Sequence, residues 1–131
     1  MKFHQLSYLI SNLKGSSYVF KTHVLVPKNK MNEEVLSCLY RAGYIVSFRI
    51  YSKKYFQVIM RADALIFFKQ FNQVSKSSRS VYMSFSNLSR KYSLSDFFVL
   101  STSRGILYSE EVFFYKVGGL LLFDNGKYLS S

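Results

Sequence analysis

A run of five residues near the C-terminus, 101–105, has the side chains best suited to bind a polyanion. The hydroxyl groups of Ser101, Thr102 and Ser103 donate and accept hydrogen bonds at short reach. Arg104 adds a permanently charged, planar guanidinium group that fits phosphate, and Gly105 lets the backbone turn or approach a partner closely. This combination favours contact with the sugar-phosphate edge of RNA. Taken alone, the run is equally compatible with a turn that carries a solvated arginine.

The same hydroxyl groups lack the partners that a catalytic site needs. Ser101 and Ser103 have no histidine near them in the sequence, because His4 and His23 both lie in the first half of the chain. The aspartates form no spaced carboxylate pair, and no GxxxxGK[ST] segment is present to hold a nucleotide. We therefore expect no enzymatic activity, no cofactor and no small-molecule substrate.

Metal binding is not expected either. Cys38 is the sole cysteine, which excludes an internal disulfide and a cysteine-based zinc site. Its spacing places it on the apolar face of a helix, so we expect it in the core. The two histidines, His4 and His23, have no HExxH pattern around them.

The composition indicates a folded, strongly basic protein. Of 131 residues, 49% are hydrophobic, which is enough to build the core of one domain or of two small lobes. Lysine and arginine number 18 against 7 acidic residues, for a net charge of +11, so a polyanionic partner would relieve the self-repulsion. No apolar run approaches the roughly 20 residues that span a bilayer, and no secretory or transit segment is evident, so we expect no membrane partner.

The helices and strands that would position these residues can be predicted from the spacing of hydrophobic residues. Apolar residues recur at three- and four-residue steps from Phe3 to Leu13, which predicts a helix that stops at Gly15. A strand is predicted over residues 18–26. A second helix is predicted between Asn29, as its N-terminal cap, and Gly43, just beyond its end. Two strands then follow and are predicted to form a β-hairpin; their ranges are 44–51 and 55–60.

The second half is predicted to be richer in strands. In chain order, the predicted segments are a strand at 65–74, a polar boundary at 75–78, a strand at 81–85, a turn or helix at 87–92, a strand at 97–101, a two-turn helix capped by Ser109, a strand at 120–123 and a polar tail at 124–131. The predicted fold class is therefore α+β with two lobes. The N-terminal lobe, 1–74, has the order α-β-α-β-β, and the lobe 75–131 is mostly β with a short helix.

In the order of its elements and in several motifs, the chain resembles the ribosomal protein S8 family. The members of this family are the eighth protein of the small ribosomal subunit. The resemblance covers about residues 3–123. Residues 101–105 stand where the family has Ser-Thr-Ser-Lys/Arg-Gly, and the Gly118-Gly119 pair follows at the family's spacing. Supporting matches are the segments Pro-Lys-Asn-Lys at 27–30, Gly-Tyr-Ile at 43–45 and Val-Tyr at 81–82. The five-residue run is short, but joined to the other motifs in order it is specific.

The resemblance implies a protein that catalyses nothing, binds the central domain of small-subunit ribosomal RNA and acts in subunit assembly. Neighbouring small-subunit ribosomal proteins are further implied partners. The implied RNA-binding residues are Ser101, Thr102, Ser103, Arg104, Gly105, Tyr82, Lys30, Lys14, Asn12, Gly118 and Gly119. Two interpretations stay open for some of them. Tyr82 either stacks on RNA or packs on its strand neighbours, and the glycine pair either contacts RNA or only turns the chain.

The chain also departs from the family pattern. Asn12 lacks the charge usual at its position, and Leu120 stands where a glutamate is expected after the glycine pair. Ser77-Ser78 replaces Pro-Gly before the Val-Tyr strand, and residues 94–96 replace a Gly-x-Gly turn. These losses, with the bias toward phenylalanine and tyrosine, indicate a divergent organellar member. We expect the mitochondrion, with the plastid as the alternative, and the alternative function is a free-standing basic RNA-binding or translation-regulatory module.

Overall fold

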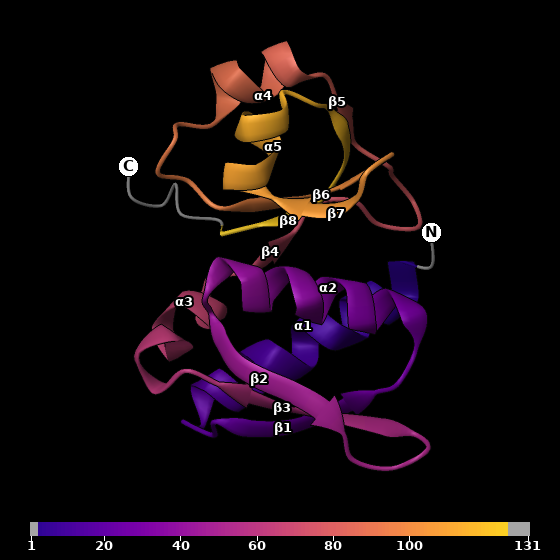
Figure 1. Cartoon of the computed structure of the whole chain (residues 1–131), viewed down its shortest axis with the longest axis vertical. Coiled ribbons are helices and arrows are strands. Elements are labelled where there is room, and N and C mark those ends of the chain that lie inside the picture. Colours follow the sequence, from indigo (N-terminus) through magenta and orange to yellow (C-terminus); the bar gives the residue numbers. More distant parts are fainter. Residues whose placement is uncertain (1–2, 126–131) are drawn as a thin grey trace. The chain divides into compact units, whose positions relative to one another are not determined.

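The computed structural model describes residues 3–125 and confirms an α+β fold (Figure 1). The chain divides into two compact units, Met1–Phe71 and Asn72–Ser131, each with its own sheet. The sequence predicts this boundary directly after Val74, where the polar stretch 75–78 begins. No helix within the described range is long and apolar enough to cross a membrane.

Helix α1, Phe3–Tyr18, opens the first unit and buries the predicted stripe of Leu6, Leu9, Ile10 and Leu13. The prediction that it stops at Gly15 is wrong. The helix continues because Ser16 and Ser17 are buried, and the Ser17 hydroxyl donates to the Lys14 carbonyl oxygen at 2.7 Å. The helix ends at Tyr18, and the chain then turns at Phe20, whose φ is 57°.

Helix α2, Lys30–Ala42, has both predicted caps. The Asn29 side chain accepts a hydrogen bond from the Asn32 backbone N–H at 2.8 Å, which satisfies one of the unpaired groups in the first turn. Gly43 ends the helix at φ 88°, a left-handed conformation that glycine adopts without a steric cost. Cys38 is fully buried, as predicted.

The first unit has a three-stranded antiparallel sheet in the order β1-β3-β2. Strand β1 is His23–Pro27, β2 is Ile45–Ile50 and β3 is Tyr55–Met60, so the predicted hairpin is confirmed. The strand predicted from residue 18 starts later, because α1 occupies residues up to Tyr18. Phe56, Val58 and Met60 point to the buried face, and none of the three strands carries an acidic residue.

The predicted strand at 65–74 is wrong. A short 3-10 turn, Ala62–Ala64, leads into helix α3, Leu65–Lys69, and only β4, Asn72–Gln73, is extended. Phenylalanine is common in strands, but here Phe68 and Phe71 are buried three residues apart and their rings meet edge to face at 5.1 Å. That spacing suits a helical turn rather than a strand.

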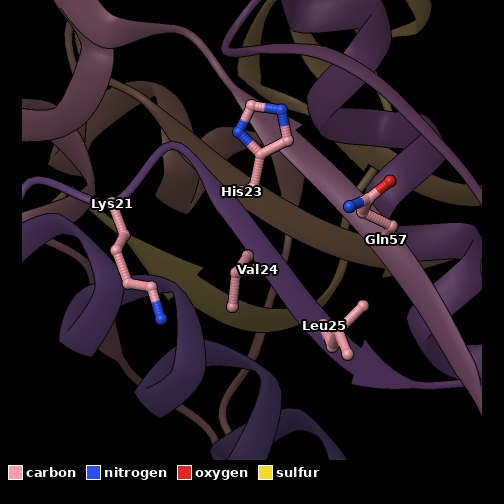
Figure 2. A pocket seen from close by; sticks show the side chains of 5 residues that line it. All are labelled: Lys21, His23, Val24, Leu25 and Gln57. Carbon is pink, nitrogen blue, oxygen red and sulfur yellow. The ribbon is translucent and has the colours of Figure 1, made fainter.

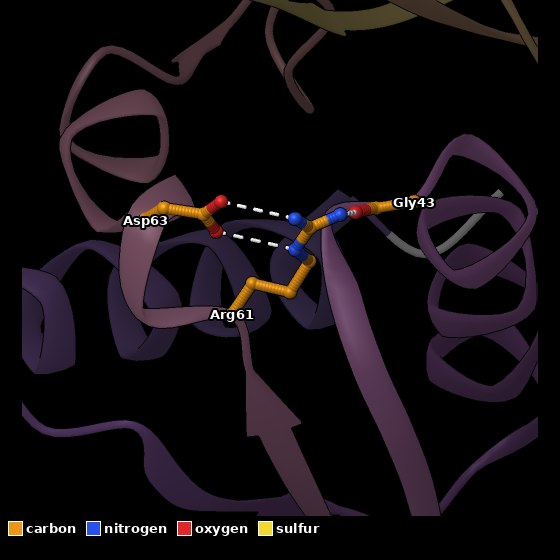
Figure 3. A network of polar contacts seen from close by, with 3 residues as sticks. All are labelled: Gly43, Arg61 and Asp63. Atoms are coloured by element: carbon orange, nitrogen blue, oxygen red, sulfur yellow. Dashed lines mark hydrogen bonds and ion pairs between the residues drawn. The ribbon is translucent and has the colours of Figure 1, made fainter.

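Arg61 ties the start of this segment to the end of α2 (Figure 3). Its guanidinium group donates to both carboxylate oxygens of Asp63, at 3.1 and 2.9 Å, and to the Gly43 carbonyl oxygen at 3.2 Å. The pair is exposed, so its contribution to stability is at most about 1 kcal/mol.

The second unit is built on a five-stranded antiparallel sheet. Along the sheet the order is β4-β8-β6-β7, and β5 also pairs with β8. The elements are β5 Tyr82–Met83, α4 Phe85–Lys91, β6 Phe98–Thr102, β7 Gly105–Tyr108, α5 Ser109–Tyr115 and β8 Gly119–Asp124. Its core contains Leu88, Phe98, Leu100, Leu107, Val112 and Leu121.

Three boundaries in this unit differ from the predictions. Phe85, predicted at the end of a strand, begins α4 because the Ser84 side chain caps that helix. Ser109 is the first residue of α5 rather than its cap, and Tyr108 occupies the cap position. Asp124, predicted in a polar tail, is buried in β8 and accepts a hydrogen bond from the Tyr92 hydroxyl at 2.6 Å. The rest of the predicted tail, 126–131, lies outside the described residues.

The continuous helix through Gly15 leads to a prediction. An added Cβ at Gly15 meets no atom within 4 Å, so Gly15→Ala is expected to raise the free energy of unfolding by about 0.5–1 kcal/mol. Urea denaturation followed by circular dichroism measures this change. Gly43→Ala is the matched control: it has equal space, but its φ of 88° should make the same substitution destabilising. Equal effects of the two substitutions would contradict the helical assignment of Gly15.

Candidate nucleic-acid interface

Residues 101–105 form the tip of the β6–β7 hairpin. Thr102 pairs with Gly105, which leaves Ser103 and Arg104 as a two-residue turn. Gly105 has a φ of 108°, a conformation that a residue with a Cβ rarely adopts. The sequence therefore needs glycine here for the turn itself.

The hydroxyl groups of this loop have different roles. Thr102 Oγ1 donates to the Gly105 carbonyl oxygen at 2.9 Å and accepts from the Arg104 backbone N–H at 3.1 Å. The Thr102 side chain thus holds the turn closed. Ser103 and Arg104 are exposed at the tip, where they can reach a partner.

The Arg104 guanidinium group lies over an aromatic ring from the next helix. Its central carbon is 4.2 Å from the centre of the Tyr115 ring, the geometry of a cation–π contact. The Tyr115 ring in turn meets the Phe114 ring edge to face at 5.1 Å. Neither Tyr115 nor Phe114 is among the RNA-binding residues predicted from the sequence. The available signal was the presence of three consecutive aromatic residues in α5, more than one apolar stripe can use.

The glycine pair lets the backbones of neighbouring segments approach closely. A Cβ at Gly119 would overlap the Ser101 carbonyl oxygen, and one at Gly118 would lie 2.5 Å from the Met83 carbonyl oxygen. Both obstacles are backbone atoms, which cannot move aside as a side chain can. This geometry supports the structural interpretation of the pair.

Tyr82 lies in the same row of the sheet as the hairpin. Tyr82 on β5 pairs with Leu120 on β8, and Leu120 pairs with Ser101 on β6. Directly paired residues of antiparallel strands point to the same face, so Tyr82 and Ser101 share a face about two strand spacings, roughly 10 Å, apart. The Tyr82 side chain is 74% exposed, which leaves its ring accessible.

The candidates in the first unit are more dispersed. Lys30 is exposed as the first residue of α2. Asn12 and Lys14 are both half-buried on α1, and a two-residue separation places them on opposite flanks of its buried stripe. They therefore do not form one contact surface on that helix.

Hydrogen bonds replace the glycine-based turns that the chain lacks. Lys76 and Arg79 exchange backbone hydrogen bonds at 2.8 and 3.0 Å, so Ser77 and Ser78 form a tight turn before β5. The later turn is closed by Asp96. Its carboxylate accepts from the Ser93 N–H at 2.9 Å, while its own N–H donates to the Ser93 carbonyl oxygen at 3.1 Å.

A shallow pocket of about 340 Å³ lies along β1 in the first unit (Figure 2). It is lined by Lys21, His23, Val24, Leu25 and Gln57. Its polar groups are an ammonium, an imidazole and an amide. Across residues 3–125, no three His, Cys, Asp or Glu side chains gather where a metal ion could bind.

Comparisons with known proteins agree with the arrangement of these elements. A family model described as Ribosomal protein S8 matches residues 4–124. The small ribosomal subunit protein uS8m of Acanthamoeba castellanii is 32% identical over 117 residues, covering 87% of this chain and 92% of that protein. The uS8c protein of Stigeoclonium helveticum is 26% identical, covering 89% and 95%, and the uS8 protein of Borrelia turicatae is 25% identical, covering 91% and 94%.

The close approach at Gly119 gives a testable prediction. Gly119→Ala is expected to lower the free energy of unfolding by about 1–3 kcal/mol or more, because the new methyl group must displace the β6 backbone. Thermal and urea denaturation would measure the loss. Gly15→Ala, with open space around it, serves as the control for the alanine substitution itself. A Gly119→Ala variant as stable as the native protein would rule out the close contact.

Proposed function

This chain belongs to the ribosomal protein S8 family, a family of the small ribosomal subunit, and we propose that it binds the central domain of small-subunit ribosomal RNA and supports subunit assembly and translation. The family is structural rather than enzymatic. The observation that carries the proposal is the exposed Ser103–Arg104 tip, fixed by the Thr102 hydrogen bonds and set in one sheet with Tyr82.

The chemistry of this surface suits RNA. A serine hydroxyl and an arginine fork can bond to phosphate oxygens and to the 2′-hydroxyl group, which distinguishes RNA from DNA. An exposed tyrosine face offers a platform for an unpaired base or a ribose. Hairpin and tyrosine together can therefore follow an irregular RNA helix from one side.

The basic residues of the first unit would contribute affinity for RNA rather than recognition of its sequence. Lys30 and Lys14 would neutralise phosphate, which strengthens binding and makes it salt-dependent. Asn12 carries no charge, so its contribution is limited to a hydrogen bond. The net charge of +11 attracts RNA to the protein as a whole.

The experiment that tests this function is sedimentation of the native ribosomal particles. The tagged protein is expected to co-sediment with the small subunit at one copy per particle. A free-standing RNA-binding regulator would instead remain near the top of the gradient or bind in substoichiometric amounts.

We further propose the mitochondrion as the compartment, with the plastid as the alternative. Relatives named uS8m and uS8c both match the chain along most of its length. The abundance of phenylalanine and tyrosine, 13 and 11 residues, fits an A+T-rich organellar genome. Fluorescence microscopy with organelle markers distinguishes the two.

The hairpin tip is tested by the double variant Ser103→Ala with Arg104→Ala. Loss of a charge-assisted contact is expected to weaken binding to the central-domain RNA by at least about tenfold, or roughly 1.5 kcal/mol. The slope of log affinity against log salt should also decrease in magnitude by about 0.7–0.9 for one lost phosphate contact. The matched control is Ser89→Ala with Arg90→Ala, another exposed serine–arginine pair in the same unit. Equal losses in both double variants would show only an effect of net charge.

Tyr82 is tested by Tyr82→Ala. Removal of the exposed ring is expected to reduce affinity for the irregular RNA helix by roughly 1–3 kcal/mol, and to have little effect on a plain duplex, which offers no unpaired base. Filter binding with both RNAs measures the difference. Tyr40→Ala removes an exposed tyrosine from α2 and is the control. No preference between the two RNAs would favour the packing interpretation of Tyr82.

A further inference from the structure

Helix α5 has more aromatic residues than its core face can use. Phe113 packs inward, with ring centres 5.8 Å from Phe98 and 6.0 Å from Phe85. The next two residues face solvent, since the Phe114 side chain is 79% exposed and the Tyr115 side chain 42% exposed. The fold of the unit therefore gives a reason for Phe113 but not for its two neighbours.

These two rings and the hairpin tip form one continuous series of contacts, which we call the Arg104–Tyr115–Phe114 ladder. The guanidinium carbon is 4.2 Å from the Tyr115 ring centre, and the Phe114 ring stands nearly perpendicular to Tyr115, at 83° and 5.1 Å. The ladder links residues from the β6–β7 turn and from the end of α5. It lies entirely within the second unit.

We propose that this ladder is a binding site for an unpaired RNA base, in which Phe114 contributes the stacking face and Tyr115 positions Arg104 toward phosphate. The proposal rests on the RNA-binding function proposed above and extends it to residues outside the Ser-Thr-Ser-Arg-Gly motif. A base stacks on any exposed aromatic face regardless of sequence, because every base has a π-face. An arginine already held against a ring loses less side-chain freedom when it binds.

The charges around the ladder determine how an RNA strand would run. Lys116 follows Tyr115 directly in the chain and is exposed, so it adds a second cation at the end of α5. Glu110 lies one turn before Phe114 on the same side of the helix and would repel phosphate. The sugar-phosphate chain is therefore expected on the side of Arg104 and Lys116, with the base reaching across toward Phe114.

An aromatic face flanked by two cations favours RNA over a protein partner. An apolar protein surface would leave Arg104 and Lys116 against a low-dielectric contact without acidic partners, which is unfavourable. A nucleotide suits both parts of this surface, since its flat base can stack on the aromatic face and its anionic phosphate can pair with the cations.

The test compares two RNAs: a central-domain transcript with its unpaired nucleotides, and a variant transcript in which those nucleotides are fully paired. Phe114→Leu keeps an apolar side chain but removes the flat ring, and is expected to weaken binding to the first RNA by at least about fivefold. It should leave binding to the paired RNA unchanged. Phe114→Tyr should restore the native affinity.

The positioning role of Tyr115 needs a separate measurement. Tyr115→Leu is expected to weaken binding to the first RNA, while Tyr115→Phe, which keeps the ring beneath Arg104, should retain it. The losses from Tyr115→Leu and Arg104→Ala should not add in the double variant, because both remove the same contact. A role of Tyr115 in stability alone would give additive losses and a lower melting temperature.

The possible failures can be told apart. If the Ser103/Arg104 double variant loses affinity but Phe114→Leu and Tyr115→Leu bind both RNAs as the native protein does, the ladder proposal is wrong and the proposed function stands. An equal loss on both RNAs would also overturn base stacking. If the native protein binds neither RNA, the proposed function fails and the ladder proposal fails with it.

Discussion

The second unit depends on the close approach of backbones around the start of β8. This strand pairs with β4, β5 and β6, so it lies between the segment that carries Tyr82 and the hairpin that carries Arg104. Only residues without a Cβ fit where β8 begins, since a methyl group at Gly118 or Gly119 would meet backbone atoms on either side. The glycine pair thus sets the spacing between the two exposed parts of the candidate interface.

Within the hairpin, rigidity and contact are assigned to different side chains. The Thr102 hydroxyl group makes its hydrogen bonds within the turn, and Gly105 provides the positive φ that the turn requires. Ser103 and Arg104 then project from a tip that is already ordered. In the proposed contact with RNA, such pre-organisation would lower the entropy lost on binding.

Local signals in the sequence were sufficient for some of these features and insufficient for others. Asn29 and Gly43 cap α2 through bonds within a few residues, so their types alone predict them. The predicted helix end at Gly15 is wrong because glycine permits a helix to end without forcing it to, and the buried Ser16 and Ser17 extend the helix beyond it. The contact between Arg104 and Tyr115 joins a turn to the far end of the following helix, and no local pattern predicts such a meeting. The role of each candidate residue in RNA binding remains a prediction of the sequence that the fold accommodates.

The edges of the sheet in the first unit affect how copies of the protein interact with one another. A three-stranded sheet has two open edges, and an open edge can pair with the same edge of another copy. Here β1 ends in Pro27, which has no N–H to donate, and all three strands lack acidic residues that could attract the basic side chains of a second molecule. The net charge of +11 makes copies of the protein repel one another, which opposes edge-to-edge pairing of this sheet.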